Sequence, residues 1–182
     1  MTVPNSNKTR LLEIEGKQLF ASGKFQQASV VFSRAADGYL EQGEDLLAAE
    51  MRNNQCVSLL QAKQAQKALV AVQGTAIIFE KAGDQLKYAM ALANEATALQ
   101  ELRRYPDAID KFTQSADLFD QLKETEMVLQ VKQSISAMQL RSRNLFGALF
   151  SMQEGLEGVN KPTLRQKILL KLLKIPQNLM GK

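Results

Sequence analysis

A repeat of forty residues is the feature of this sequence that most restricts its fold. Three series of small or apolar residues keep this interval along the chain, and an acidic series shares it. Repeats of this length are typical of stacked helical arrays, in which each repeat buries its apolar face only against its neighbours. We therefore interpret the small and apolar series as core positions and expect no functional site among them. The series are Ala28, Ala68, Ala108 and Ala148; Ala36, Ala76, Ala116 and Leu156; Tyr39, Phe79, Phe119 and Val159; and Glu44, Asp84 and Glu124.

Each forty-residue copy is predicted to contain two helices. Apolar residues recur at helical spacing within each half-copy, and Gly43 lies where a helix is expected to end. Pro106 is predicted to lie in the first turn of its helix, and Asn144 to cap another. The first predicted helix begins near Thr9. The others span about 25–42, 45–62, 67–82, 84–102, 106–122, 125–142 and 144–158.

The composition excludes several classes of function. The 182 residues include no histidine and one cysteine, Cys56. Histidine-dependent catalytic triads, disulfides within the chain and Cys-x-x-Cys sites are therefore excluded. No glycine-rich phosphate loop is present. We predict a protein that is not an enzyme and holds no cofactor or metal, with Cys56 as a small buried residue.

The expected location is the cytoplasm. A single thiol fits a reducing compartment. Residues 1–10 lack the apolar stretch of a secretory signal, and no run approaches the roughly 18 apolar residues of a membrane span.

The basic charge of the chain is concentrated at its C-terminus. The net charge is +4, and residues 160–182 hold six basic residues and no acidic one. The rest of the chain therefore carries 17 basic and 19 acidic residues. Because this body is close to neutral, we expect no binding of nucleic acid.

Residues 160–182 also predict a basic amphipathic helix, which Thr163 caps and Pro176 ends. Such a helix can cover the open apolar face of the last repeat, which is the role we favour. It can otherwise bind a partner or a second copy of the chain, or lie on an anionic membrane surface. The residues expected to make contacts in those alternatives are Arg165, Lys167, Lys171 and Lys174.

Two segments resemble the signature of tetratricopeptide repeats. Residues 23–28 are Gly-Lys-Phe-Gln-Gln-Ala, and residues 104–109 are Arg-Tyr-Pro-Asp-Ala-Ile. In both, an aromatic residue precedes an alanine by three positions, and a second alanine follows eight positions later. The usual period is 34 residues, so the chain is similar to the long-repeat subgroup. The resemblance covers about residues 9–159, and the second and fourth copies depart from the pattern at Ala65, Leu145 and Gly155.

This resemblance implies both a fold and a function. We expect an all-α, right-handed α-solenoid of four helix-turn-helix repeats, at about 9–43, 44–83, 84–123 and 124–159. Residues 1–8 are expected to be flexible, and the basic helix to cap the last repeat. In this family the first helix of each repeat lines a concave groove that binds a peptide or partner helix. The implied function is a protein–protein interaction scaffold or adaptor; the alternatives are a membrane-surface adaptor and a self-associating structural module.

The family's groove positions can be carried over by register. They are mixed and nearly neutral, so we expect a neutral partner segment with apolar anchors rather than a carboxylate clamp. Glu15, Gln55 and Glu95 stand where the family has an apolar residue, so each either hydrogen-bonds between repeats or contacts the partner. The predicted groove residues are Arg10, Glu13, Lys17, Glu50, Asn53, Val57, Leu60, Met90, Thr97, Gln130 and Gln133.

Overall fold

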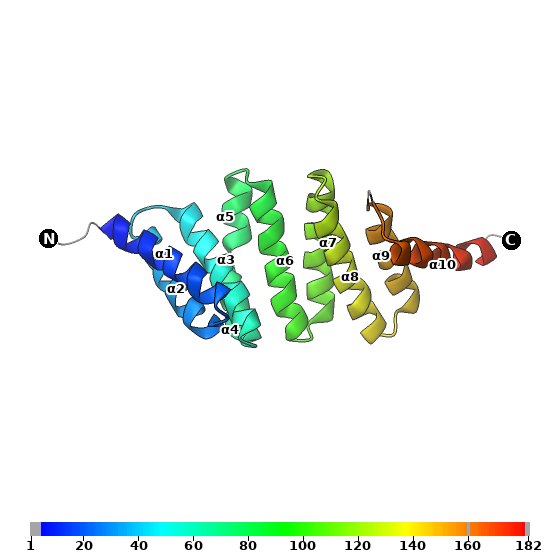
Figure 1. Ribbon diagram of the computed structural model, residues 1–182, viewed down its shortest axis with the longest axis horizontal. Helices are drawn as coiled ribbons and strands as arrows, with labels where there is room; N and C mark the ends of the chain where they lie inside the picture. The colour runs from blue at the N-terminus through cyan, green and yellow to red at the C-terminus, as the bar shows by residue number, and fades with distance from the viewer. Residues whose placement is uncertain (1–4, 160, 181–182) are drawn as a thin grey trace. The chain divides into compact units, whose positions relative to one another are not determined.

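The computed structural model describes residues 5–159 and 161–180, with side chains described for 7–159 and 161–173. These residues form helices and no strand, and the helices pack in neighbouring pairs, which confirms the predicted all-α class (Figure 1). The helices are α1 (Asn5–Ala21), α2 (Phe25–Leu40), α3 (Asp45–Gln61), α4 (Ala65–Val72), α5 (Thr75–Lys81), α6 (Gln85–Glu101), α7 (Tyr105–Gln121), α8 (Thr125–Arg141), α9 (Leu145–Glu157) and α10 (Leu164–Met180).

The chain divides into two compact units, Met1–Ala108 and Ile109–Lys182. In the first unit, α2 packs on α1 and α3, and α3 also contacts α4, α5 and α6. Helix α6 contacts α4 and α5 as well. In the second unit, α8 packs on α9, and α9 contacts α10.

Helices end at intervals of twenty residues, in turns of one kind. At each of these turns one residue has a φ between 59° and 74°, in the left-handed region. The next amide then donates to the carbonyl five residues earlier, as from Lys24 to Leu19 and from Arg104 to Leu99, both at 2.9 Å. This bond satisfies a carbonyl that the helix end leaves unpaired. The residues with positive φ are Gly23, Gly43, Lys63, Gly83, Arg103, Lys123 and Arg143.

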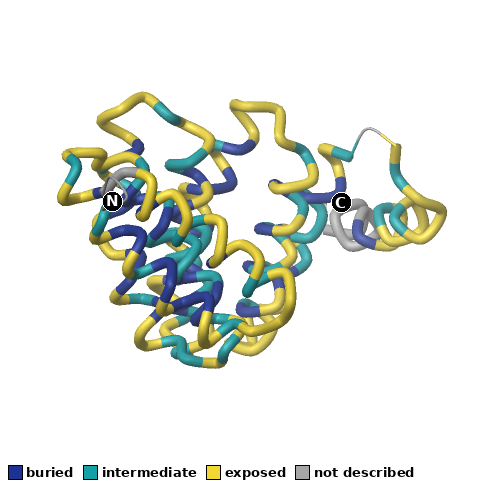
Figure 2. Tube along the Cα trace, turned by 60° about the vertical axis from the view of Figure 1, so that its left-hand side comes forward, coloured by how far each residue is buried: buried dark blue, intermediate teal, exposed yellow. Residues whose placement is uncertain are grey.

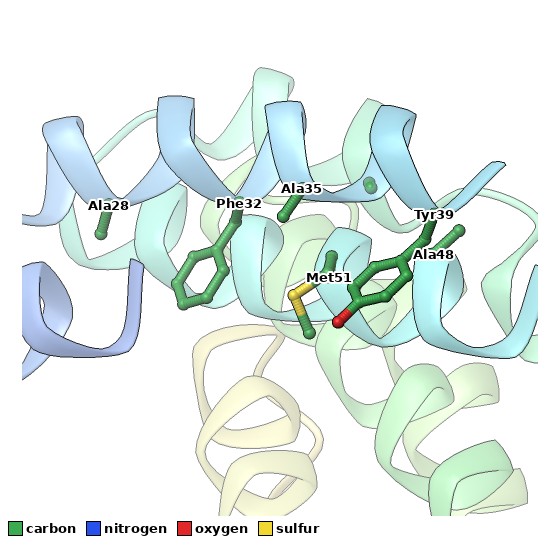
Figure 3. Close-up of a cluster of buried hydrophobic side chains, with 7 residues drawn as sticks. Ala28, Phe32, Ala35, Tyr39, Ala48 and Met51 are labelled. Carbon is green, nitrogen blue, oxygen red and sulfur yellow. The ribbon is translucent and has the colours of Figure 1, made fainter. Parts of the chain in front are cut away.

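Most of the repeated alanine and aromatic positions form the core, as predicted, whereas Ala76 and Val159 of the same series are half-buried. Ala28, Ala68, Ala108 and Ala148 are at most 1% exposed. Figure 2 shows that the buried residues of the first unit lie where its helices face one another. Small residues on one helix allow its neighbour to approach closely, and larger side chains fill the remaining space. In Figure 3 the core residues of α2 face those of α3: Ala28, Phe32, Ala35 and Tyr39 on α2, and Ala48 and Met51 on α3.

The predicted single helix over residues 67–82 is wrong. The structure has two helices there, α4 and α5, with a break at Gln73 and Gly74. Gln73 has an extended ψ of 126°, and Gly74 has a φ of 84°. A right-handed helix accommodates neither value. The signal for this break was a lone glycine inside an otherwise helical pattern.

Two other helix ends also differ from the prediction. Helix α1 begins at Asn5 rather than near Thr9. Within it, the buried Thr9 hydroxyl accepts a hydrogen bond from Gln42 Nε2 at 2.7 Å. This contact ties the early turns of α1 to the end of α2. The predicted flexible segment is thus helical at 5–8, while 1–4 lie outside the described residues. Helix α10 continues through Pro176 to Met180, because a proline removes one backbone donor without preventing further helix.

Candidate functional site

Three predicted groove residues connect helices of the first unit to one another. Glu13 of α1 accepts hydrogen bonds from Lys17 Nζ at 2.5 Å and from the Tyr39 hydroxyl of α2 at 2.6 Å. Burial alone would raise the pKa of Glu13, but these two bonds and the charges of Lys17 and Arg10 together outweigh it, and the pKa is lowered. Burial, followed by the bond to Glu13, raises the pKa of Tyr39 to about 12. Glu13 therefore fixes α1 against α2.

Glu50 and Asn53 of α3 serve the same purpose toward the following helices. Lys87 of α6 forms an ion pair with Glu50, and this hydrogen bond is the main reason that the pKa of Lys87 is raised. Asn53 Oδ1 accepts from Asn94 Nδ2 of α6 at 3.4 Å and from the Thr75 hydroxyl at 3.5 Å. The polar side chains of Glu50 and Asn53, which were predicted to contact a partner, instead bind other helices of the same unit.

A small apolar cavity lies between α1 and α3, at two of the predicted groove residues. Its volume is about 180 Å³. Phe32 of α2, which lines the cavity, is 2% exposed, whereas the Lys17 side chain is 59% exposed. An apolar cavity of about 150 Å³ holds a benzene-sized group, so this one accommodates a single aliphatic or aromatic side chain. It is lined by Lys17, Phe20, Phe32, Asn54 and Val57.

The other predicted groove residues do not line this cavity. Arg10 and Met90 are exposed, and Leu60 and Thr97 are half-buried. The Thr97 hydroxyl donates to a carbonyl of its own helix. Gln130 and Gln133 are exposed on α8, in the second unit. The structure therefore joins Lys17 and Val57 at one cavity.

Sequence reasoning missed a second hollow in the first unit, a cleft of about 610 Å³ lined by α2, α3 and α4. Gln55, which was expected either to bond between repeats or to meet a partner, lines this cleft and is half-buried. The residues that line this cleft come from three different helices, so the forty-residue spacing of the sequence did not reveal that they lie together.

The C-terminal helix is capped as predicted. The Gln166 amide donates to Thr163 Oγ1 at 3.3 Å, and the Thr163 amide donates to Gln166 Oε1 at 2.7 Å. This reciprocal pair is a capping box. Helix α10 contacts α9, and Leu173 is 7% exposed. The predicted contact residues Arg165, Lys167 and Lys171 are exposed, while the Lys174 side chain lies outside the described residues.

One row of apolar residues on α10 remains exposed. Leu164, Ile168 and Leu172 lie one turn apart and are 74%, 51% and 57% exposed. Phe146 and Phe150 of α9 are exposed as well, at 68% and 57%. The sequence predicted an amphipathic helix whose apolar residues cover the last repeat. The structure divides them into a contact at Leu173 and an outward row.

The described residues offer neither a metal site nor a membrane-spanning helix. They contain no group of three or more Cys, Asp or Glu placed to hold a metal ion. No helix within them is both long and apolar enough to cross a membrane. Cys56 is buried as predicted, and its burial, together with the charge of Glu95, raises the pKa of the thiol to about 12. The thiol is therefore protonated near neutral pH.

Comparison with known proteins gives no matching family model and no curated protein of significant similarity. The resemblance to tetratricopeptide repeats therefore stays a prediction that rests on the motifs at residues 23–28 and 104–109.

Proposed function

We propose that the protein is a non-catalytic, peptide-binding scaffold and that its first unit holds an apolar side chain of a partner between α1 and α3. The observation that carries this proposal is the cavity of about 180 Å³ lined by Phe20, Phe32 and Val57. A preformed pocket lowers the entropy cost of binding, because the protein orders few side chains on association. Since Lys17 is paired with Glu13, the rim favours an apolar anchor over a free carboxylate.

We also propose the finer architecture that this function requires, a right-handed α-solenoid of four tetratricopeptide-type repeats. Two periodicities support it. Alanines buried at steps of forty residues and left-handed turns at steps of twenty both indicate equal helix pairs. The contact of α10 with α9 and the burial of Leu173 support a capping role for that helix.

The experiment selects short random peptides against the full chain and then measures their binding by fluorescence anisotropy. We expect enriched peptides to share one aliphatic or aromatic residue. Val57→Lys, which places a charge in the cavity, is expected to weaken binding at least about tenfold, the loss typical of a hot-spot contact. The matched control is Ile77→Lys on α5, where the isoleucine is 54% exposed and lines neither this cavity nor any other hollow of the first unit described above.

Circular dichroism must first show that both variants are folded, so that a change in binding can be assigned to the substituted side chain. If every enriched peptide binds the Val57→Lys protein as tightly as the original chain, the cavity is not the binding site. Selection without any shared apolar residue would count against an apolar anchor.

The exposed row of α10 favours a second function, attachment to an anionic membrane surface. From helical geometry, Lys171 and Arg165 lie about 60° to either side of the row that Ile168 centres. An apolar strip with cations on both flanks is the arrangement found in helices that lie in a membrane interface. The absence of acidic residues from 160–182 adds to the attraction.

Vesicle co-sedimentation tests this second function. We expect the full chain to sediment with vesicles of phosphatidylcholine and phosphatidylserine, and not with phosphatidylcholine alone. Ile168→Glu should abolish sedimentation, whereas Ile77→Glu on α5, at a side chain of similar exposure, should not. Equal sedimentation of both variants, or of both vesicle types, would rule out an attachment through α10.

A further inference from the structure

The cleft between α2 and α4 is separate from the cavity of the proposed function. Its α2 residues recur every three or four positions from Gln26 to Asp37, so one whole face of that helix borders it. Arg52 and Leu59 of α3 also line it. By helical geometry they lie on nearly the opposite face of α3 from Val57. A ligand can therefore occupy the cleft without reaching the cavity.

Three cations, one from each bordering helix, line this cleft. They are Arg34 of α2, Arg52 of α3 and Lys67 of α4, and Asp37 is the one acidic residue that lines the cleft with them. The side chains of all three cations form no ion pair or hydrogen bond with the described residues. Arg52 is moreover half-buried. A guanidinium partly removed from water and lacking a counter-charge binds a carboxylate favourably.

The cleft also offers apolar surface between these cations. Val30 of α2 and Val70 of α4 line it and are 53% and 61% exposed. Leu59 and Ala71 are buried beneath them. A ligand that uses the whole cleft must therefore combine negative charge with an apolar group.

We propose that this cleft docks an acidic segment of a partner protein. An apolar side chain of the segment lies between Val30 and Val70, and its carboxylates pair with Arg34, Arg52 and Lys67. The two arginines are suited to this because a guanidinium binds a carboxylate through two parallel hydrogen bonds. The site adds a second, charge-dependent contact to the scaffold and does not depend on the α1–α3 cavity.

Two other occupants fit the cleft less well. The basic segment 160–182 of a second copy would bring six further cations against the three already there. A nucleic acid would find no aromatic side chain for base stacking, and Asp37 would repel its phosphates. An acidic segment meets both the charge and the apolar surface.

The test uses the full chain carrying Val57→Lys, which disables the cavity and leaves the cleft intact. Short random peptides are selected against this protein, and their binding is measured by fluorescence anisotropy. We expect enriched peptides to carry several Asp or Glu residues around an apolar one. Binding should weaken as salt rises from about 0.1 M to about 1 M, because the Debye length falls from about 10 Å to about 3 Å.

Charge reversal within the cleft identifies the site. Arg52→Glu and Lys67→Glu are each expected to weaken binding at least about tenfold. The exposed Lys67 provides a variant that leaves the packing untouched. Lys81→Glu on α5, an exposed cation outside the cleft, is the matched control and should bind like its parent. When the acidic residues of a peptide are replaced by lysine one at a time, the replacement of the partner of Arg52 should restore binding to the Arg52→Glu protein.

Three results would overturn the proposal. One is the enrichment of no peptide, or only of peptides without acidic residues. Another is equal binding by the Lys67→Glu and Lys81→Glu proteins. The third is tighter binding of a labelled oligothymidylate than of the acidic peptides, which would assign the cleft to nucleic acid. None of these results affects apolar peptide binding that depends on Val57, so failure of this site is distinguishable from failure of the proposed function.

Discussion

Gly16 is the position at which one added methyl group tests the packing of α1 on α2. A Cβ atom there would lie 2.7 Å from Cε1 and 2.8 Å from Cδ1 of Phe32. The Phe32 ring is 2% exposed and belongs to a buried cluster with Ala35 and Met51, which limits its movement away from Gly16 (Figure 3). We therefore expect Gly16→Ala to destabilise the protein.

The expected magnitude is the difference between two opposing effects. Alanine in place of glycine inside a helix favours folding by about 1 kcal/mol. Overpacking a well-packed core costs about 1 to 3 kcal/mol. Because two contacts would fall below 3.0 Å, we place the cost in the upper part of that range. The net loss in the free energy of unfolding is then about 1 to 2 kcal/mol.

A double-mutant cycle measured by urea denaturation separates the two effects. Phe32→Leu shortens the side chain that Gly16→Ala would strike. In that background we expect Gly16→Ala to stabilise the protein by about 1 kcal/mol, through helix propensity alone. The coupling between the two sites is then about 2 to 3 kcal/mol. If Gly16→Ala raised the stability equally in both backgrounds, the close approach of α1 to Phe32 would be refuted.

The remaining predictions concern the turn at Lys63, the hydrogen-bonded pair of Tyr39 and Glu13, and the thiol of Cys56. Lys63 has a φ of 60°, so Lys63→Gly should raise the free energy of unfolding by about 1 kcal/mol. Lys67→Gly, inside α4, should lower it by a similar amount. If urea denaturation showed that both variants change the stability in the same direction, this prediction would be contradicted. The pKa of Tyr39 is raised to about 12, so its contribution to stability is complete below about pH 10 and is lost as the pH rises to about 12. Thermal unfolding should show this alkaline loss diminished in Tyr39→Phe, and an unchanged profile would argue against it. The lowered pKa of Glu13 acts in the opposite direction: its contribution is complete above its unfolded pKa and is lost as the pH falls through the folded value. Cys56 is buried, and the pKa of its thiol is raised to about 12, so a disulfide reagent near pH 8 should label it only after unfolding in urea; rapid labelling of the native protein would disprove its burial.

The features that sequence predicted correctly are those fixed by neighbours in the chain or by the repeat. Asn144 and Thr163 cap helices because a cap needs only an amide two or three residues ahead. Ala28 and Ala68 are buried because a residue on the inner face of one repeat has an equivalent on the next. In both cases the determining contacts are local or are repeated many times.

The groove residues were predicted less well, because their surroundings depend on single distant side chains. Glu13 was predicted to line the groove, yet the Tyr39 hydroxyl reaches it from 26 residues away. Glu50 is likewise paired with Lys87, which follows it by 37 residues. No periodicity encodes such pairs, since each occurs once. The positions carried over from the resemblance could identify the expected groove face of α3. They could not show which residues on that face remain available to a partner.

Departures from the repeat distinguish one inter-helix surface from another in this chain. One step of forty residues after Arg34, Arg52 and Lys67 the sequence has Gly74, Leu92 and Asp107. The cation set of the α2–α4 cleft therefore occurs once, although the alanines that support it recur. Leu92 is 2% exposed, so the position that offers a guanidinium in one copy is part of the core in the next. The repeated residues thus set the spacing of the helices, and binding specificity has to come from the residues that do not repeat. An acidic partner segment that needs all three cations finds no equivalent set in the next copy of the repeat.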